Sequence, residues 1–414
     1  MKHELQVEIL KELMQQLDEG RNIDAGVQYR VPTAAYVCPD QAATEWNTFF
    51  RNHPQLIGLS QDLPEPGTFM TLDDFGTPLL ATRDKNGVFR AFLNACSHRA
   101  VKVAAEPRGK QSIFMCPFHN WSYANTGDLI AIPNEDHFGA IDKSCHGLIA
   151  LPAVERDGLL WVHPQADGHL DVDDLLGAEL AAELASFGLE RHGFAGATPI
   201  PGDLNWKFAN DTFGETYHFG KLHKDTLGRV FYGNNLHFKA FGRHHRFVTA
   251  SRGIDRLRAL PESEWRVEGS TFVLYYLFPN IQLICSRESA TLIRIYPDPA
   301  NPGRSMTKVS FYFSPETAAE AAARDAAGVD PRAVYDPSNE RRGPSLQSAF
   351  EVFKSTIEQE DYVMGALQQR TAETGQLKEV ILGRNEPALH HFHQNYREAL
   401  NQPPLEPVRA VESA

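Results

Sequence analysis

The sequence lacks the features that mark several common classes of protein. Its 414 residues contain no apolar run of about 18 residues, so we expect no membrane span. The first 20 residues, MKHELQVEILKELMQQLDEG, lack the continuous apolar core of a secretory signal, and we expect a cytoplasmic protein. Asp and Glu (53) outnumber Lys and Arg (40), and this net charge of −13 argues against a nucleic-acid partner.

Cysteine is scarce as well. The five cysteines are too few and too scattered for a disulfide framework, and in a reducing compartment regularly spaced Cys and His more often bind metal. The hydrophobic content of 42% and the aromatic content of 10% argue against disorder and are sufficient for large cores. The length is typical of two or three domains.

The expected elements divide the chain into three segments. Residues 1–40 predict a helix and an extended arm that packs on the last domain. Residues 41–167 contain short strand-like runs between turns. Residues 168–414 predict grouped strands between helices, which favours an α+β domain with an antiparallel sheet. In this last segment we expect helices at 168–190, over most of 206–223 and at 346–370, and a polar surface loop at 330–345.

The first cluster of metal-binding residue types is Cys96-Ser-His98 followed by Cys116-Pro-Phe-His119. Zinc fingers usually keep two Cys in one half and two His in the other, whereas here each half is mixed. A [2Fe–2S] cluster with two unlike irons suits this pattern, since one iron takes two thiolates and the other two imidazoles. The pattern therefore favours the iron–sulfur cluster, with zinc as the alternative.

The runs LNACSHRA and CPFHNWSY resemble the Rieske cluster box, in which Trp121 stands where a shielding aromatic often lies. The resemblance implies an all-β Rieske [2Fe–2S] domain at 41–167, with Cys96, His98, Cys116 and His119 as ligands. Rieske domains also occur in proteins that only carry electrons, so this motif alone does not define the function.

A second candidate metal site is indicated by His218 and His223, which are five residues apart and so not on one face of a regular helix. Gly220 lets the helix end between them, so that both imidazoles can converge on one metal with a carboxylate as third ligand. The alternative is a pair of ordinary core histidines.

The carboxylate candidates are Glu360 and Asp361 in the helix expected at 346–370. Both lie within roughly 65° of the centre of the apolar stripe, so helical periodicity does not choose between them. The stripe predicted to be buried consists of Leu346, Phe350, Phe353, Ile357, Met364 and Leu367.

The pattern NWK…GE-x-YH-x₄-H and the later QED are similar to Rieske non-haem iron aromatic ring-hydroxylating oxygenases, large (α) subunit, over about 41–370. The resemblance implies a helix-grip (START/Bet v1-like) catalytic domain at 168–414 and one mononuclear Fe(II) on His218, His223 and Asp361. It also implies a homotrimer, with or without a β subunit, in which Glu215 bridges His119 of one subunit to His218 of the next. Many members have Asp where this chain has Glu215.

Several further residues are assigned by their place in the motif. Asp211 is a candidate catalytic acid beside Glu215, either for a polar or cationic substrate or as the partner of a ligand histidine. Pocket walls are expected from Asp211, Thr212, Phe213 and Ile357. The strand-like run with Phe272, Leu274, Tyr276 and Phe278 is a candidate for the remaining walls, but its alternation does not show which face points inwards. Two further groups of histidines are expected on a helix face or subunit contact (His390, His391, His393) and at the surface or pocket rim (His244, His245).

The implied function is that of a terminal oxygenase that uses O₂ to hydroxylate an aromatic or other small cyclic substrate. Electrons from NAD(P)H would arrive only indirectly, through a ferredoxin or flavin reductase. The alternatives are an oxidative N- or O-demethylase of the same family and a non-catalytic Rieske electron carrier. About three irons per chain favour an oxygenase and about two a carrier.

Overall fold

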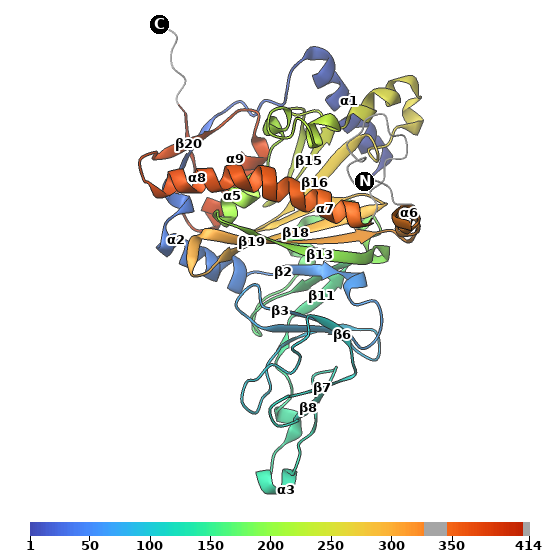
Figure 1. The fold of residues 1–414 in the computed structure, drawn as a ribbon, viewed down its shortest axis with the longest axis vertical. Coiled ribbons are helices and arrows are strands. Elements are labelled where there is room, and N and C mark those ends of the chain that lie inside the picture. The colour runs from blue at the N-terminus through green and yellow to red at the C-terminus, as the bar shows by residue number, and fades with distance from the viewer. Residues whose placement is uncertain (327–345, 409–414) are drawn as a thin grey trace. The chain divides into compact units, whose positions relative to one another are not determined.

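The computed structural model describes residues 1–326 and 346–408, so the polar loop expected at 330–345 lies outside the described residues. Contacts divide the chain into two compact units. Unit 1 joins Met1–Thr44, Leu176–Phe187 and His192–Ala414, and unit 2 joins Glu45–Leu175 and Gly188–Arg191. The α+β class predicted from the sequence is confirmed, because unit 2 is rich in short strands and unit 1 contains one large antiparallel sheet (Figure 1).

Unit 2 holds three small antiparallel sheets, with strand orders β10-β5-β4-β3-β6, β11-β12-β2 and β7-β8-β9. A core of aromatic and aliphatic side chains that includes Phe114, Trp121 and Tyr123 lies beneath the two Cys/His loops. The bounds are β2 (Gln55–Leu59), β3 (Thr68–Leu72), β4 (Leu79–Arg83), β5 (Phe89–Leu93), β6 (Arg108–Lys110), β7 (Ile113–Met115), β8 (Ser122–Ala124), β9 (Leu129–Ala131), β10 (Ala150–Leu151), β11 (Ala153–Arg156) and β12 (Leu159–Val162).

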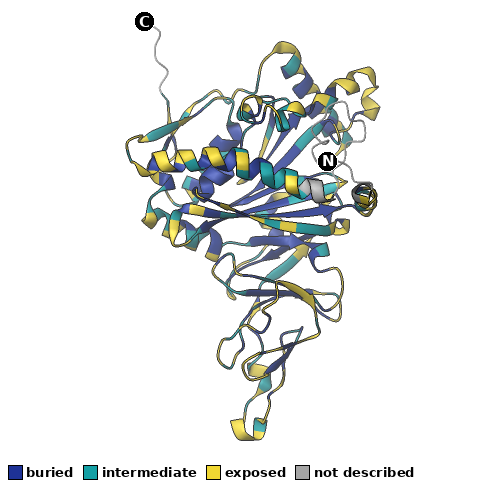
Figure 2. Cartoon of the chain, viewed as in Figure 1, coloured by how far each residue is buried: buried dark blue, intermediate teal, exposed yellow. Residues whose placement is uncertain are grey.

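Unit 1 is built on a seven-stranded antiparallel sheet in the order β13-β19-β18-β17-β16-β15-β14. Strands β14 to β19 follow one another as neighbours, and β13 pairs with β19 at one edge. The central strands are buried on both faces, and Figure 2 shows them mostly dark blue. The bounds are β13 (Gly193–Gly202), β14 (His237–Phe241), β15 (His244–Ala250), β16 (Thr271–Leu277), β17 (Ile281–Cys285), β18 (Ser289–Asp298) and β19 (Asn301–Phe313).

Helices and an N-terminal arm surround this sheet. The arm strand β1 (Tyr29–Pro32) pairs with β20 (Glu379–Leu382) and β21 (Glu406–Pro407). In the described part of the chain, no helix combines the length and the apolar character needed to cross a membrane. Helix α4 (Val172–Ala185) begins in unit 2 and continues into unit 1. The other helices of unit 1 include α1 (His3–Glu19), α5 (Trp206–Asp211), α6 (Pro315–Ala326), α7 (Leu346–Thr356), α8 (Tyr362–Glu373) and α9 (Pro387–Ala399).

The helix expected at 346–370 is interrupted by a π-helical turn, Ile357–Asp361, between α7 and α8. The N–H of Tyr362 donates to the carbonyl of Ile357, five residues back, so the turn holds one residue more than an α-helical turn. Beyond it the buried positions move by one residue, and α8 buries Tyr362, Gly365, Gln369 and Ala372. The stripe prediction was therefore wrong for Met364 and Leu367, which are 43% and 49% exposed.

Two other expectations from the sequence were wrong. Only the first six residues of 206–223 form an α-helix, because the chain turns after Asp211 and resumes as a short 3₁₀ turn, Tyr217–Gly220. His244 and His245 are not at the surface but 3% and 2% exposed, because β15 is an interior strand of the sheet. His244 Nδ1 accepts the N–H of Phe278, and His245 stacks on Tyr276.

The tight β11–β12 hairpin gives a test of the fold of unit 2. Asp157 and Gly158 have φ values of 50° and 84°, and a Cβ on Gly158 would lie 2.3 Å from the backbone nitrogen of Glu190. Gly87 has a φ of 78° but nothing within 4 Å of its Cβ position. We expect Gly158→Ala to lower the free energy of unfolding by about 2–4 kcal/mol and the control Gly87→Ala by about 1–2 kcal/mol. Urea unfolding measures both, and equal losses would contradict the packing described for this hairpin.

Candidate metal centres

The two Cys/His loops of unit 2 have the same backbone form. The first follows β5 and closes with the N–H of Ala100 donating to the carbonyl of Cys96 at 2.8 Å. The second joins β7 to β8 and closes with the N–H of Asn120 donating to the carbonyl of Cys116 at 2.9 Å. Ala100 and Asn120 both have left-handed backbone conformations, with φ values of 60° and 58°. Each loop thus presents one thiol and one imidazole from a single tight turn.

The structure brings these four side chains together, with thiols inside and imidazoles outside. Cys96 and Cys116 are buried, whereas His119 is exposed and His98 is half-buried. The His98 and His119 rings lie 4.7 Å apart between centroids, and Trp121 stacks on His98 at 5.0 Å. Burial raises the pKa of the Cys116 thiol, so two thiolates in this core need a cation beside them. Two buried sulfurs and two outer nitrogens fit the unlike irons of a [2Fe–2S] cluster.

Polar groups beside Cys96 also fit a cluster. The Tyr123 hydroxyl lies 3.1 Å from the Cys96 Sγ and 2.9 Å from the Ser97 hydroxyl. The Ser97 hydroxyl donates to the carbonyl of His146 at 2.7 Å. Hydrogen bonds to the sulfurs are one of the ways in which a protein adjusts the reduction potential of an iron–sulfur cluster.

In unit 1 the structure brings His218, His223 and Asp361 together. The two Nε2 atoms are 3.1 Å apart, and Asp361 Oδ1 lies 3.2 Å from His223 Nε2 and 3.5 Å from His218 Nε2. With bonds of about 2.1 Å to one metal, donors at right angles lie about 3.0 Å apart, and donors at tetrahedral angles about 3.4 Å. The triangle therefore fits one metal ion with its other coordination positions open.

The backbone after α5 turns these two histidines towards each other. Glu215 accepts the N–H groups of Tyr217 and His218, which fixes the start of the 3₁₀ turn. The N–H of Leu222 then donates to the carbonyl of His218 at 2.8 Å, so that His223 follows directly after a closed turn. A turn of this kind, in place of a continuous helix, lets residues five apart face a single point.

A carboxylate holds the outer nitrogen of each imidazole. His218 Nδ1 pairs with Glu215 Oε1, and His223 Nδ1 lies 2.6 Å from Glu360 Oε2. Glu360 also accepts the hydroxyl of Thr226 at 3.0 Å. Such partners set the tautomer and orientation of a ligand histidine, with the Nε2 directed at the metal. The neighbours Glu360 and Asp361 therefore contact opposite nitrogens of His223.

The charges at this triad favour a bound cation. Burial lowers the pKa of His218, but hydrogen bonds and charge attraction from Asp361 and Glu215 outweigh burial and raise it to about 9. Burial raises the pKa of Asp361, but hydrogen bonds from His218 and His223 outweigh burial and lower it. The carboxylates thus favour positive charge at this point, which a divalent metal supplies when it replaces the proton on Nε2.

Asp211 does not contact the triad histidines. It accepts the Tyr36 hydroxyl at 3.0 Å, and its two oxygens lie 3.0 and 3.1 Å from His393 Nε2. The carboxylate thereby joins the end of α5 to the arm and to α9. Of the three C-terminal histidines, His390 and His393 are buried and His391 is half-buried, all on α9. The roles of Tyr36 and His393 were missed because no spacing in the sequence relates them to residue 211.

An apolar cavity of about 320 Å³ borders the triad. Thr212, Phe213 and Ile357, expected as walls, all line it. On β16 the cavity is lined by Phe272 and Leu274. Tyr276 on the same strand, and Phe278 directly after it, do not border the cavity. The phenylalanines that line it are Phe213, Phe219, Phe231, Phe247, Phe272, Phe311, Phe313 and Phe353.

A second, more open hollow of about 850 Å³ borders the triad from another direction. It shares Thr212, Glu215, His218 and Asp361 with the apolar cavity, and Asp211 lines it as well. Exposed apolar side chains of Met364, Leu367, Leu377 and Ile381 form part of its lining. The metal donors therefore lie between an apolar cavity and an open surface hollow.

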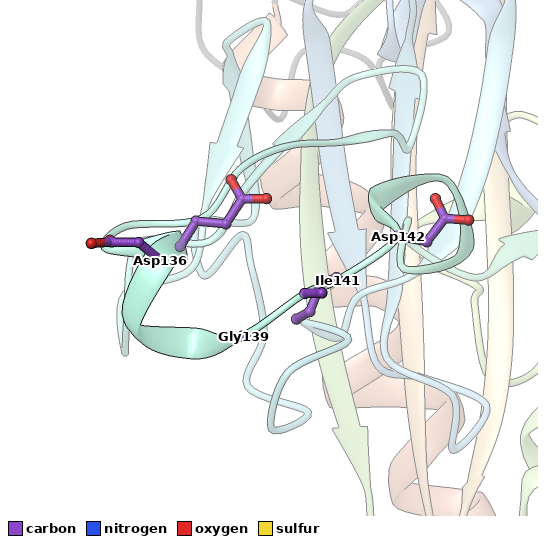
Figure 3. A pocket seen from close by; sticks show the side chains of 6 residues that line it. Asp136, Gly139, Ile141 and Asp142 are labelled. Atoms are coloured by element: carbon purple, nitrogen blue, oxygen red, sulfur yellow. The ribbon is translucent and has the colours of Figure 1, made fainter.

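A third hollow of about 600 Å³ lies along Glu135–Asp142 in unit 2 (Figure 3). Asp136 and Asp142 lie on opposite sides of this loop, so their carboxylates do not converge. Glu135 pairs with Lys143, and Asp142 accepts from Ser144. These carboxylates are bound within the loop and form no donor set.

Comparison with known proteins places both units in one family. The "Ring hydroxylating alpha subunit (catalytic domain)" family matches residues 189–402, and the "Rieske [2Fe-2S] domain" family matches residues 53–151. The chain therefore belongs to the α subunits of Rieske non-haem iron oxygenases. A [2Fe–2S] cluster and a mononuclear iron are typical of that family, and both donor sets described above fit them.

The relatives differ in the substrates that they are named for. The Rhodococcus jostii biphenyl 2,3-dioxygenase subunit alpha is 33% identical over 173 residues, 40% of this chain and 37% of that protein. The Chromohalobacter salexigens glycine betaine monooxygenase oxygenase subunit is 28% identical over 199 residues, 48% of this chain and 44% of that protein. The aligned parts thus span about half or less of these relatives.

Solved structures share the fold over nearly the whole chain. The quaternary ammonium Rieske monooxygenase CntA has a TM-score of 0.73 at 18% identity, covering 91% of this chain and 96% of that one. Naphthalene 1,2-dioxygenase from Rhodococcus sp. has a TM-score of 0.67 at 19% identity, covering 96% and 98%.

Substitution of the two neighbouring acids tests their division of roles. Asp361→Ala removes an oxygen donor, and we expect loss of the mononuclear iron with the cluster retained. Glu360→Gln keeps the size but weakens the hold on His223, and we expect mononuclear iron to bind about 10–100 times more weakly. Iron analysis and chelator competition measure both. If Glu360→Gln releases this iron and Asp361→Ala retains it, the roles are reversed.

The cysteine and histidine loops have a separate test. We expect the reduced protein to give a Rieske-type electron paramagnetic resonance signal and to contain about three irons per chain. Cys116→Ala should abolish the signal and leave about one iron, because the mononuclear donors lie in the other unit. A colourless protein with zinc in these loops would contradict the cluster assignment.

Proposed function

We propose that this chain is the terminal oxygenase component of a Rieske oxygenase system that hydroxylates a small, uncharged, apolar cyclic substrate. The observation that carries the proposal is a two-histidine, one-carboxylate donor set bordering an apolar cavity of about 320 Å³. When bound, the two metal groups supply one-electron transfer and activation of O₂. An electron carrier has no need of this donor set or of the cavity beside it.

The cavity lining supports an uncharged substrate. Among the described residues that line it, the charged or ionisable ones are the triad and Glu215, and each already pairs within that cluster. The acid considered for a cationic substrate, Asp211, lines the open hollow and is held by Tyr36 and His393. Ring edges and faces from eight phenylalanines would hold an aromatic substrate against the metal and exclude water.

Oxidative N-demethylation is the second candidate within the same family. Phenylalanine faces attract a quaternary ammonium group through cation–π interaction, although less strongly than tryptophan faces. Several of the relatives are named glycine betaine or carnitine monooxygenases. The absence of an available carboxylate among the described cavity residues weighs against this candidate.

The surfaces near each donor set support electron delivery from another chain. Beside the exposed His119, the apolar side chains of Met115 and Phe118 are more than half exposed. The open hollow next to Glu215 and His218 has its own apolar rim. We propose that a ferredoxin or flavin reductase reduces the cluster, and that in a homotrimer the cluster of one subunit docks at this hollow of the next.

Glu215 is the residue we assign to that junction. Its carboxylate holds His218 Nδ1 and lines the open hollow, so a second imidazole could reach it from a neighbouring subunit. Bridging His218 to His119 of that subunit would fix both tautomers. The side chain is therefore a positioning residue for the metal donor and part of the electron route.

The activity is tested by a screen of purified, iron-loaded protein with a surrogate reductase under ¹⁸O₂. The panel contains benzene, toluene, naphthalene and biphenyl together with glycine betaine and carnitine. We expect ¹⁸O-labelled hydroxylated product from at least one hydrocarbon and none from the ammonium compounds. If an ammonium compound gives formaldehyde and no hydrocarbon gives a hydroxylated product, the reaction is oxidative demethylation and the proposed hydroxylation is wrong.

The role of Glu215 is tested by single turnover on pre-reduced protein. Glu215→Gln keeps the size and removes the charge that holds the imidazole, a loss of about 1–3 kcal/mol that leaves the fold intact. We expect retained metals and trimer but at least tenfold slower cluster oxidation in the presence of substrate and O₂. The exposed Glu262→Gln is the matched control. Wild-type cluster oxidation in Glu215→Gln would rule out the bridge.

A further inference from the structure

Another, smaller cavity, of about 180 Å³, lies next to the apolar cavity of about 320 Å³ that borders the metal donors. We call the smaller one the outer cavity and the one beside the metal donors the inner cavity. The outer cavity lies where β16 begins, β17 ends and β18 begins. Both cavities are lined by Phe272, Ile284 and Ser289. The two cavities therefore share part of their lining at this point.

Strand register places Phe272 and Ile284 on the face of the sheet that lines the inner cavity. Ile284 on β17 lies opposite Leu274 on β16 and Thr291 on β18, and both of these neighbours line the inner cavity. Phe272 lies two residues before Leu274, on the same face of β16. It is held by ring contacts with Phe231 at 5.5 Å and Phe247 at 6.2 Å. Phe272 and Ile284 are only half-buried, as expected of side chains with a cavity on each side.

The outer cavity has both apolar and polar residues in its lining. Phe187, Val267 and Val273 contribute apolar surface, and Glu268 and Ser286 contribute polar groups. An alkyl chain or a second ring could occupy this space while the reacting ring lies beside the metal donors. The inner cavity alone would hold a compact substrate, whereas both together would hold an elongated one.

We propose that the two cavities are parts of one substrate site and that Phe272 and Ile284 form the wall that limits substrate length. The outer cavity is then the subsite for the apolar distal part of the substrate. This proposal rests on the proposed function only in taking the occupant to be a substrate. Its test depends on binding and not on turnover.

The test is the affinity of iron-loaded protein for an alkylbenzene series from toluene to n-hexylbenzene, measured by calorimetry. Each buried CH₂ contributes about 0.8 kcal/mol, which is about fourfold in affinity. In the wild type we expect the gain in affinity per methylene to stop at the alkyl chain length that reaches the wall. In Phe272→Ala the increments should continue for further methylenes, because the outer cavity becomes accessible.

Phe353→Ala is the matched control, because Phe353 lines the inner cavity but not the outer one and loses the same volume. In Phe353→Ala the affinity should stop rising at the same alkyl chain length as in the wild type. Ile284→Ala is the second wall variant, used if Phe272→Ala fails to bind iron or to unfold cooperatively, and it should also extend the series.

Two results would overturn the proposal. One is a wild type whose affinity rises with every methylene, and the other is wall variants that stop at the same chain length as the wild type and Phe353→Ala. Extended binding without any hydroxylated product would leave the two-cavity site standing and would count against the proposed function. If hydroxylated product forms but the wall variants bind the alkylbenzenes as the wild type does, the proposed function stands and the two-cavity site is wrong.

Discussion

The π-helical turn Ile357–Asp361 is the feature on which the mononuclear site depends. A regular α-helix places consecutive side chains about 100° apart, so two neighbouring acids cannot both be centred on one contact. The wider turn directs Asp361 to the Nε2 side of His223 and Glu360 to its Nδ1 side. One imidazole is thereby held between a carboxylate that would share a metal with it and another that sets its tautomer.

The surrounding architecture supplies what this arrangement needs. The large sheet and α7 enclose an apolar cavity on one side of the donor set, and the open hollow with its apolar rim lies on another. Burial makes each carboxylate costly unless it is paired, and each described carboxylate around the donors has a partner. In the proposed function, substrate and electrons would therefore approach the metal donors from different directions.

Local spacing indicated the four Cys/His residues and the two histidines as candidate donors, whereas the choice of Asp361 came from the resemblance to the family and the shape of its helix was not predicted. The mixed Cys/His halves have few chemical explanations, so this motif can be interpreted without tertiary information. The spacing of His218 and His223 alone is also that of ordinary core histidines, and the Rieske box earlier in the chain is what favours a metal site. Periodicity could not choose between Glu360 and Asp361, and it wrongly buried Met364 and Leu367, because it assumed 100° per residue through a turn that holds an extra residue. The Asp211, Tyr36 and His393 contacts join residues 175 and 182 positions apart, which no local pattern can reveal.

The most direct test of this account is a crystal structure of the iron-loaded protein with anomalous diffraction recorded at the iron edge. The account predicts one isolated iron peak bonded to the Nε2 atoms of His218 and His223 and to a carboxylate oxygen of Asp361. Glu360 should remain on His223 Nδ1, without a bond to the metal. An iron bonded to Glu360, or a His223 ring turned to bind through Nδ1, would contradict it.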